Sequence, residues 1–174
     1  MADSLDRQLL RQARRLARLD PNRPQQGNLR RAVSTAYYGL FHFLVNHACR
    51  AVLGTSNDLR PYRNILARAY QHGVMASACK SFAGTTLPKS IQKRLPAGFK
   101  VPPDLTCVAQ TFRDAQEKRH LADYDPGQHF RRSDVLALIR DIEDAITSFS
   151  NIQRLPETKF FLVALLVWNT LTNR

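Results

Sequence analysis

Hydrophobic positions recur at three- and four-residue spacing along most of the chain, which is the periodicity of amphipathic helices. No segment alternates with the period of two that is typical of strands. The predicted fold is therefore all-α, an up-and-down helical bundle of five or six helices. The pattern predicts helices over residues 4–19, 28–53, 61–83, 104–124, 133–149 and 157–171, with a short basic helix over 89–95.

Loops and helix ends are predicted from Gly, Pro and capping residues. Residues 20–27 are rich in Pro and Gly and are expected to form a loop, after which Asn28 caps the next helix. Ser133 is expected to cap a later helix in the same way. The segment 61–83 is expected to break near His72 and Gly73.

The end of the chain is predicted to be a separate element. We expect residues 1–155 to form the helical bundle and residues 156–174 to form an apolar helix that packs on the domain or on a partner. The apolar run 160–168 is nine residues long, whereas a membrane-spanning helix needs about twenty. The beginning of the chain lacks the pattern of a secretory signal. We therefore expect a cytoplasmic protein that is not inserted in a membrane.

The helix predicted over residues 104–124 carries most of the polar chemistry. On a helical wheel, its polar face brings together Arg113, Glu117, His120 and Tyr124. Arg119 instead falls on the apolar face, where a buried guanidinium requires a partner. Asp123, one turn further on, is the nearest carboxylate by helical spacing. We therefore expect Arg119 to be largely buried and paired with Asp123.

The charge of the chain favours an anionic partner. Lys and Arg number 26 against 14 Asp and Glu, which gives a net charge of +12, and 20 of the basic residues are arginine. Arginine binds phosphate through two N–H groups at once, so a domain of this kind is a candidate to bind RNA or a nucleotide. The alternatives are a solvated basic surface or an acidic protein partner. The outer face of the first helix supplies the candidate nucleic-acid-binding residues Arg11, Arg14, Arg15 and Arg18.

Metal and cofactor chemistry is not predicted. Cys49, Cys79 and Cys107 are odd in number and far apart, so neither a disulfide framework nor a zinc site is indicated. We expect them to be buried free thiols. No Gly-rich phosphate loop and no clustered carboxylates are present, so no cofactor and no metal site are expected.

Three segments of the sequence resemble the HEPN family, the higher eukaryotes and prokaryotes nucleotide-binding domain. Residues 31–42 resemble the family's long helix, with Ser34, Tyr37 and Tyr38 at matching positions. Residues 72–82 resemble its following helix. Residues 119–125 resemble the R-x-x-A-D-Y signature of one branch, in which Arg119, Asp123 and Tyr124 are the motif residues. The resemblance covers about residues 5–150.

The resemblance implies a function in toxin–antitoxin or defence systems. Catalytic members of the family carry an Arg followed by a His on one helix, and Arg113 and His120 fit that pattern with six residues between them. Such a pair would make the protein a metal-independent endoribonuclease that leaves a 2′,3′-cyclic phosphate. The family pairs two such helices across a homodimer, and its members associate with nucleotidyltransferase-type antitoxins.

A second alignment leads to a different function. If Arg119 occupies the position of the family's Arg, then Tyr124 stands where the catalytic His is expected. The protein is then a non-catalytic HEPN interaction module that partners a nucleotidyltransferase, with Arg119 and Asp123 in structural roles. Both readings remain open at the level of the sequence.

Overall fold

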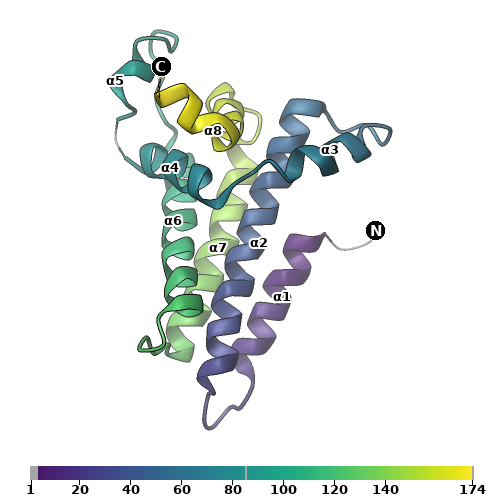
Figure 1. The fold of residues 1–174 in the computed structure, drawn as a ribbon, viewed down its shortest axis with the longest axis vertical. Coiled ribbons are helices and arrows are strands. Elements are labelled where there is room, and N and C mark those ends of the chain that lie inside the picture. Colours follow the sequence, from purple (N-terminus) through teal and green to yellow (C-terminus); the bar gives the residue numbers. More distant parts are fainter. Residues whose placement is uncertain (1–3, 85, 174) are drawn as a thin grey trace. The chain divides into compact units, whose positions relative to one another are not determined.

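The computed structural model describes residues 4–84 and 86–173, which contain eight helices and no strand. The all-α class is thus confirmed, but the described residues form eight helices instead of five or six. One additional helix arises because the segment 61–83 divides into two helices, separated by residues 68–71, a little before the expected break. The other is the short helix predicted over 89–95, which forms over Lys89–Gln92. The helices are α1 (Leu5–Arg18), α2 (Gln26–Leu53), α3 (Arg60–Ala67), α4 (His72–Ala83), α5 (Lys89–Gln92), α6 (Pro103–Tyr124), α7 (Arg132–Ile152) and α8 (Pro156–Thr172) (Figure 1).

Both predicted helix caps are wrong. The helix α2 begins at Gln26, so Asn28 lies within the first turn of the helix. The side-chain amide of Asn28 donates a hydrogen bond to Oδ2 of Asp20 at 2.9 Å. The helix α7 begins at Arg132, and the Ser133 hydroxyl donates to Oδ1 of Asp134 at 3.1 Å. In both cases the side chain expected to cap its own helix makes a different hydrogen bond.

The chain divides into two compact units, and each is made of two segments. The first unit comprises the chain through Phe43 together with Thr111–Ile146, and the second comprises Leu44–Gln110 together with the chain from Thr147 onward. The long helices α2, α6 and α7 therefore each contribute residues to both units.

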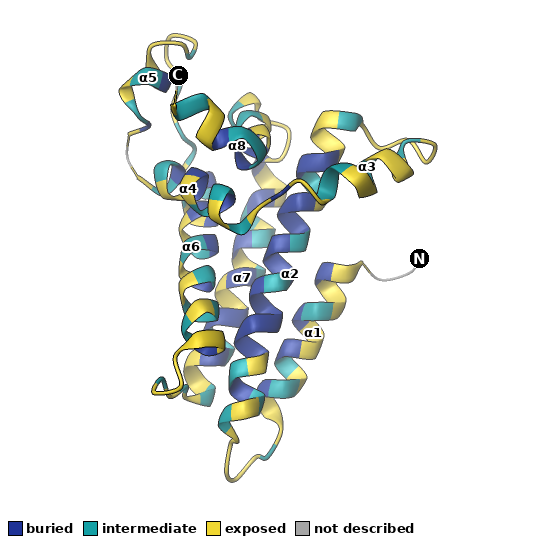
Figure 2. Cartoon of the chain, viewed as in Figure 1, coloured by how far each residue is buried: buried dark blue, intermediate teal, exposed yellow. Residues whose placement is uncertain are grey.

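The core of the first unit is formed by α1 and the parts of α2, α6 and α7 that belong to it. The α2 residues 32–37 are all buried (Figure 2). Within this core, the ring centroids of Tyr37 and Phe112 lie 5.5 Å apart. A Cβ atom at Gly39 would lie only 3.0 Å from the side chain of Leu10, so the absence of a side chain at Gly39 allows α1 to pack closely on α2.

Arg132 fixes the connection between α1 and α2. Its guanidinium donates hydrogen bonds to four backbone carbonyls at the end of α1 and in the following loop, at 2.6–2.9 Å. These carbonyls have no partner within the helix, and a cation there also interacts favourably with the helix dipole. The carbonyls belong to Ala17, Leu19, Asp20 and Pro21.

The second unit contains a cluster of aromatic side chains between α4 and α8. Phe82 of α4 lies with its ring centroid 5.0 Å from that of Phe161 and 5.7 Å from that of Trp168. The apolar face of α8 is thus covered by α4 of the same chain. No helix among the described residues is long and apolar enough to span a membrane.

The free thiols differ in exposure. Cys49 and Cys79 are buried as expected, but Cys107 is exposed, so the prediction of buried thiols is wrong for this residue.

Candidate functional site

The candidate site lies in the first unit, at the C-terminal end of α6, and is built around Arg119. Nε of Arg119 lies 2.7 Å from Oδ2 of Asp123, and only 17% of the Arg119 side chain is exposed. The expected burial and pairing of Arg119 are thus confirmed. The Nε–H does not make a well-directed hydrogen bond to any described residue, so this contact is an ion pair.

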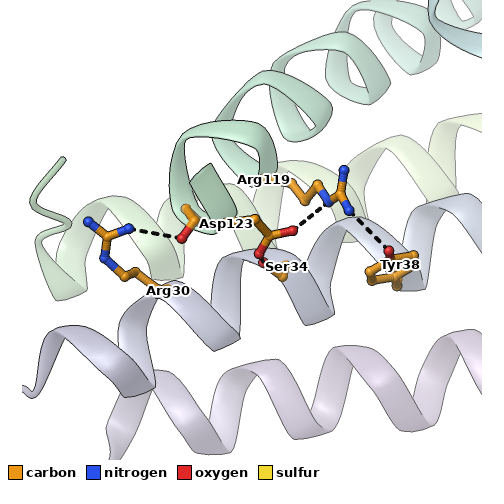
Figure 3. Close-up of polar contacts among 6 residues, drawn as sticks. Arg30, Ser34, Tyr38, Arg119 and Asp123 are labelled. Atoms are coloured by element: carbon orange, nitrogen blue, oxygen red, sulfur yellow. Dashed lines mark hydrogen bonds and ion pairs between the residues drawn. The ribbon is translucent and has the colours of Figure 1, made fainter. Parts of the chain in front are cut away.

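The ion pair is joined to α2 by two hydroxyl groups. The Ser34 hydroxyl donates to Oδ1 of Asp123 at 2.5 Å, and Nη2 of Arg119 donates to the Tyr38 hydroxyl at 3.3 Å (Figure 3). Both oxygens of the Asp123 carboxylate therefore have a partner. The cluster cross-links α2 and α6 within the first unit.

Three tyrosine rings surround the guanidinium of Arg119. Its Cζ atom lies 5.9 Å from the ring centroid of Tyr37, 5.7 Å from that of Tyr38 and 5.6 Å from that of Tyr124, within the range of cation–π interactions. Desolvation lowers the pKa of Arg119, but its electrostatic interactions with Tyr38, Asp123 and the other two tyrosines raise the pKa by more. Arg119 is therefore positively charged, and its guanidinium interacts with Asp123 and the three tyrosines.

Arg30 of α2 binds the end of α6 close to this cluster. Nη1 and Nη2 of Arg30 donate to four backbone carbonyls at 2.5–3.1 Å. One of these hydrogen bonds is drawn in Figure 3. Like Arg132 at the end of α1, it satisfies carbonyls that have no partner within the helix. The acceptors belong to Ala122, Asp125, Pro126 and Gln128.

His120 and Tyr124 form an exposed pair of rings beside this cluster. Their ring centroids lie 4.9 Å apart, His120 is exposed, and 64% of Tyr124 is accessible to solvent. The Tyr124 ring also makes the cation–π contact with the guanidinium of Arg119. An ordered aromatic ring with this exposure can stack on a nucleobase.

Arg113 lies too far along α6 from His120 for the two side chains to form a compact catalytic site within one chain. It lies on the same helix as His120 but seven residues earlier, which is a rise of about 10.5 Å along the axis. Arg113 is half-buried. The two side chains would therefore have to extend along α6 to act on one phosphate.

The arginines of α1 are not equivalent. Arg14 is half-buried and forms an ion pair with Glu143 of α7. Arg11, Arg15 and Arg18 are exposed, so the predicted nucleic-acid-binding face carries three exposed arginines.

Sequence reasoning missed the contributions of Arg30 and Ser34. A signal for them exists, because Arg30, Ser34 and Tyr38 follow one another at four-residue intervals and so share one face of α2. That spacing identifies a polar face on an otherwise apolar helix, although not the helix against which it packs.

Among the described residues, no group of three His, Cys, Asp or Glu side chains is placed to hold a metal ion. Comparison with known proteins gives no match, whether to a family model, a curated protein or a solved structure.

Proposed function

We propose that this protein is a HEPN-like domain that binds RNA or a nucleotide at the C-terminal end of α6. The observation that carries the proposal is the exposed ring pair of His120 and Tyr124, held beside the Arg119 cluster. Aromatic rings that stack on unpaired bases are a common means by which proteins bind single-stranded RNA. Single-stranded RNA is therefore the ligand to test first.

The exposed arginines of α1 support an anionic ligand. They would attract a phosphate backbone. Arg30 and Arg132 do not contribute to such a surface, because their guanidinium groups are bound to backbone carbonyls. Arg119 is held by its ion pair with Asp123 and its hydrogen bond to Tyr38.

Endoribonuclease activity is a second candidate, favoured by the exposure of His120 on the helix that carries Arg113. His120 would take the proton of a ribose 2′-hydroxyl, whose oxygen then attacks the adjacent phosphorus. The bond from phosphorus to the 5′-oxygen of the next nucleotide breaks, and that oxygen takes a proton from solvent. Arg113 would stabilise the negative charge on the phosphate. The products are a 2′,3′-cyclic phosphate and a 5′-hydroxyl, and no metal takes part.

A homodimer would shorten the distance between these groups. If a twofold axis passes beside α6, Arg113 of one copy and His120 of the other line one cleft. A nucleotidyltransferase-type antitoxin is the protein partner that the resemblance implies, in a cytoplasmic toxin–antitoxin or defence system. The non-catalytic alternative keeps the same partner and the same RNA-binding surface.

The test uses a labelled single-stranded RNA incubated with the purified protein in EDTA. If the site binds RNA, Tyr124→Ala lowers the affinity about fivefold or more, because stacking on one ring contributes roughly 1–3 kcal/mol. Tyr62→Ala, which removes an equally exposed tyrosine from α3, serves as the control. Equal loss in both variants, or no binding by the parent protein, would overturn the proposal.

The same reactions decide between enzyme and binding module. Cleavage that leaves a cyclic phosphate and is lost in His120→Gln, with affinity retained, identifies an endoribonuclease. Salt-dependent binding without cleavage identifies the non-catalytic module.

A further inference from the structure

The sequence between Asp58 and Asp104 contains no acidic residue. Over the same interval the chain has eight basic residues, so this part of the second unit has a large excess of positive charge. Four of the chain's six lysines lie within residues 80–100. An excess of one sign over a contiguous segment attracts ligands of the opposite sign. The basic residues are Arg60, Arg63, Arg68, Lys80, Lys89, Lys93, Arg94 and Lys100.

A pocket of about 830 Å³ opens within this basic segment, lined by Gly84 and by residues between 86 and 106. Its walls are largely apolar and include Leu87, Leu95 and Phe99, while Lys100 and Thr106 supply polar groups. Pockets that bind small molecules usually have volumes of about 300–1,000 Å³, apolar walls and a few polar groups. No carboxylate side chain is among the described residues that line this one.

The pocket walls are anchored to the rest of the second unit. Leu87 is only 5% exposed, and the ring of Phe99 packs edge-on against Phe160 of α8 with centroids 6.1 Å apart. The side-chain amide of Gln92 donates a hydrogen bond to the carbonyl of Leu87. Gly98, at φ 84°, makes the turn that leads to Phe99. These contacts favour a pocket that exists before a ligand binds.

We propose that this pocket binds a small molecule with an apolar body and one anionic group, with Lys100 binding the anionic group. The apolar walls account for the body of the ligand, and the absence of carboxylates from the described lining, together with Lys100, accounts for its charge. The nearest acidic residue in the sequence, Asp104, lies in the first turn of α6 and does not line the pocket. This site belongs to the second unit and is independent of the RNA-binding proposal.

Two fluorescent probes with the same aromatic body separate the two parts of the proposal. The probe 8-anilinonaphthalene-1-sulfonate carries an anionic group, whereas N-phenyl-1-naphthylamine is uncharged. We expect the intact protein to bind both at one saturable site. Lys100→Glu should weaken binding of the sulfonate about fivefold or more and leave the neutral probe nearly unaffected, because one charge contact is changed.

The matched control is Lys80→Glu, which makes the same change of charge on α4 in the same unit, outside the pocket lining. Ala97→Trp, at an exposed position of the lining, should weaken both probes by filling the pocket. Circular dichroism checks that each variant keeps its helices.

Three results would overturn the proposal. The first is equal loss of sulfonate binding in Lys100→Glu and Lys80→Glu, which would indicate a general effect of charge. The second is unchanged binding of both probes in Ala97→Trp, which would place them elsewhere. The third is displacement of the sulfonate by a single-stranded oligoribonucleotide but not by octanoate, which would indicate a nucleic-acid surface. Displacement by octanoate but not by inorganic phosphate is the result that we expect.

Discussion

Asp123 lies one helical turn after Arg119, and its Oδ2 atom approaches the Nε atom of Arg119 to 2.7 Å. An ion pair between neighbouring turns of one helix would usually add little to stability when exposed. Here the same carboxylate also accepts the hydroxyl of Ser34 from α2, so the pair contributes to packing between two helices. The loss of either charged partner should therefore affect the fold of the first unit.

Arg119→Ala should lower the free energy of unfolding by about 2–3 kcal/mol, since it leaves a partly buried carboxylate without its cation and removes three cation–π contacts. Urea denaturation followed by circular dichroism measures this change. Lys118→Ala, the half-buried neighbour, is the control. Equal stability of the two variants would contradict a structural role for the cluster.

Arg30→Lys and Arg132→Lys should each destabilise the protein although the charge is kept. A lysine ammonium cannot bind four carbonyls in the plane of a guanidinium, so we expect a loss of about 1–2 kcal/mol per variant. Arg31→Lys and Arg131→Lys change exposed neighbours and should have almost no effect. Thermal unfolding of the four variants tests the difference, and similar melting temperatures in all four would refute it.

His42 should make the protein less stable as the pH falls below about 6.5. Burial lowers the pKa of His42 below its ordinary value of 6.5, and the nearby Asp6 only partly offsets this effect. The unfolded chain therefore binds a proton more readily than the folded one, so the stabilisation present above pH 6.5 is lost as the pH falls through the folded pKa. Unfolding of the parent protein should depend more steeply on pH between about 7.5 and 5.5 than that of His42→Gln. Identical pH profiles would exclude this role for His42.

Tyr70→Phe should leave the stability unchanged or raise it by up to about 1 kcal/mol. The Tyr70 hydroxyl is buried without a hydrogen-bond partner among the described residues, and burial raises its pKa, with a further contribution from Cys49. Removing such a group removes a desolvation cost without breaking a hydrogen bond. Chemical denaturation measures the effect, with Tyr62→Phe at an exposed site as the control. A loss of more than about 1 kcal/mol would show that the hydroxyl is bound.

The all-α class and the interiors of the main helices could be predicted from the sequence because the apolar period is a local property. The pair of Arg119 and Asp123 was predictable for the same reason, since four-residue spacing within a helix fixes which side chains meet. Helix caps at Asn28 and Ser133 were predicted wrongly, because each side chain hydrogen-bonds to an aspartate instead of capping its helix. Arg30 and Ser34 could not be assigned to the site, since their acceptors lie about 90 residues later in the chain.

Arg132 at the end of α1 and Arg30 at the end of α6 reduce the number of arginines that can bind phosphate. For single-stranded nucleic acid, the logarithm of the binding constant falls with the logarithm of salt concentration with a slope of about −0.7 per phosphate neutralised. Guanidinium groups bound to backbone carbonyls, such as those of Arg30 and Arg132, displace no counterions when a ligand arrives. The formal charge of +12 therefore overstates the number of positive charges that can bind phosphate. Some of the arginines instead join the end of one helix to another helix of the same chain.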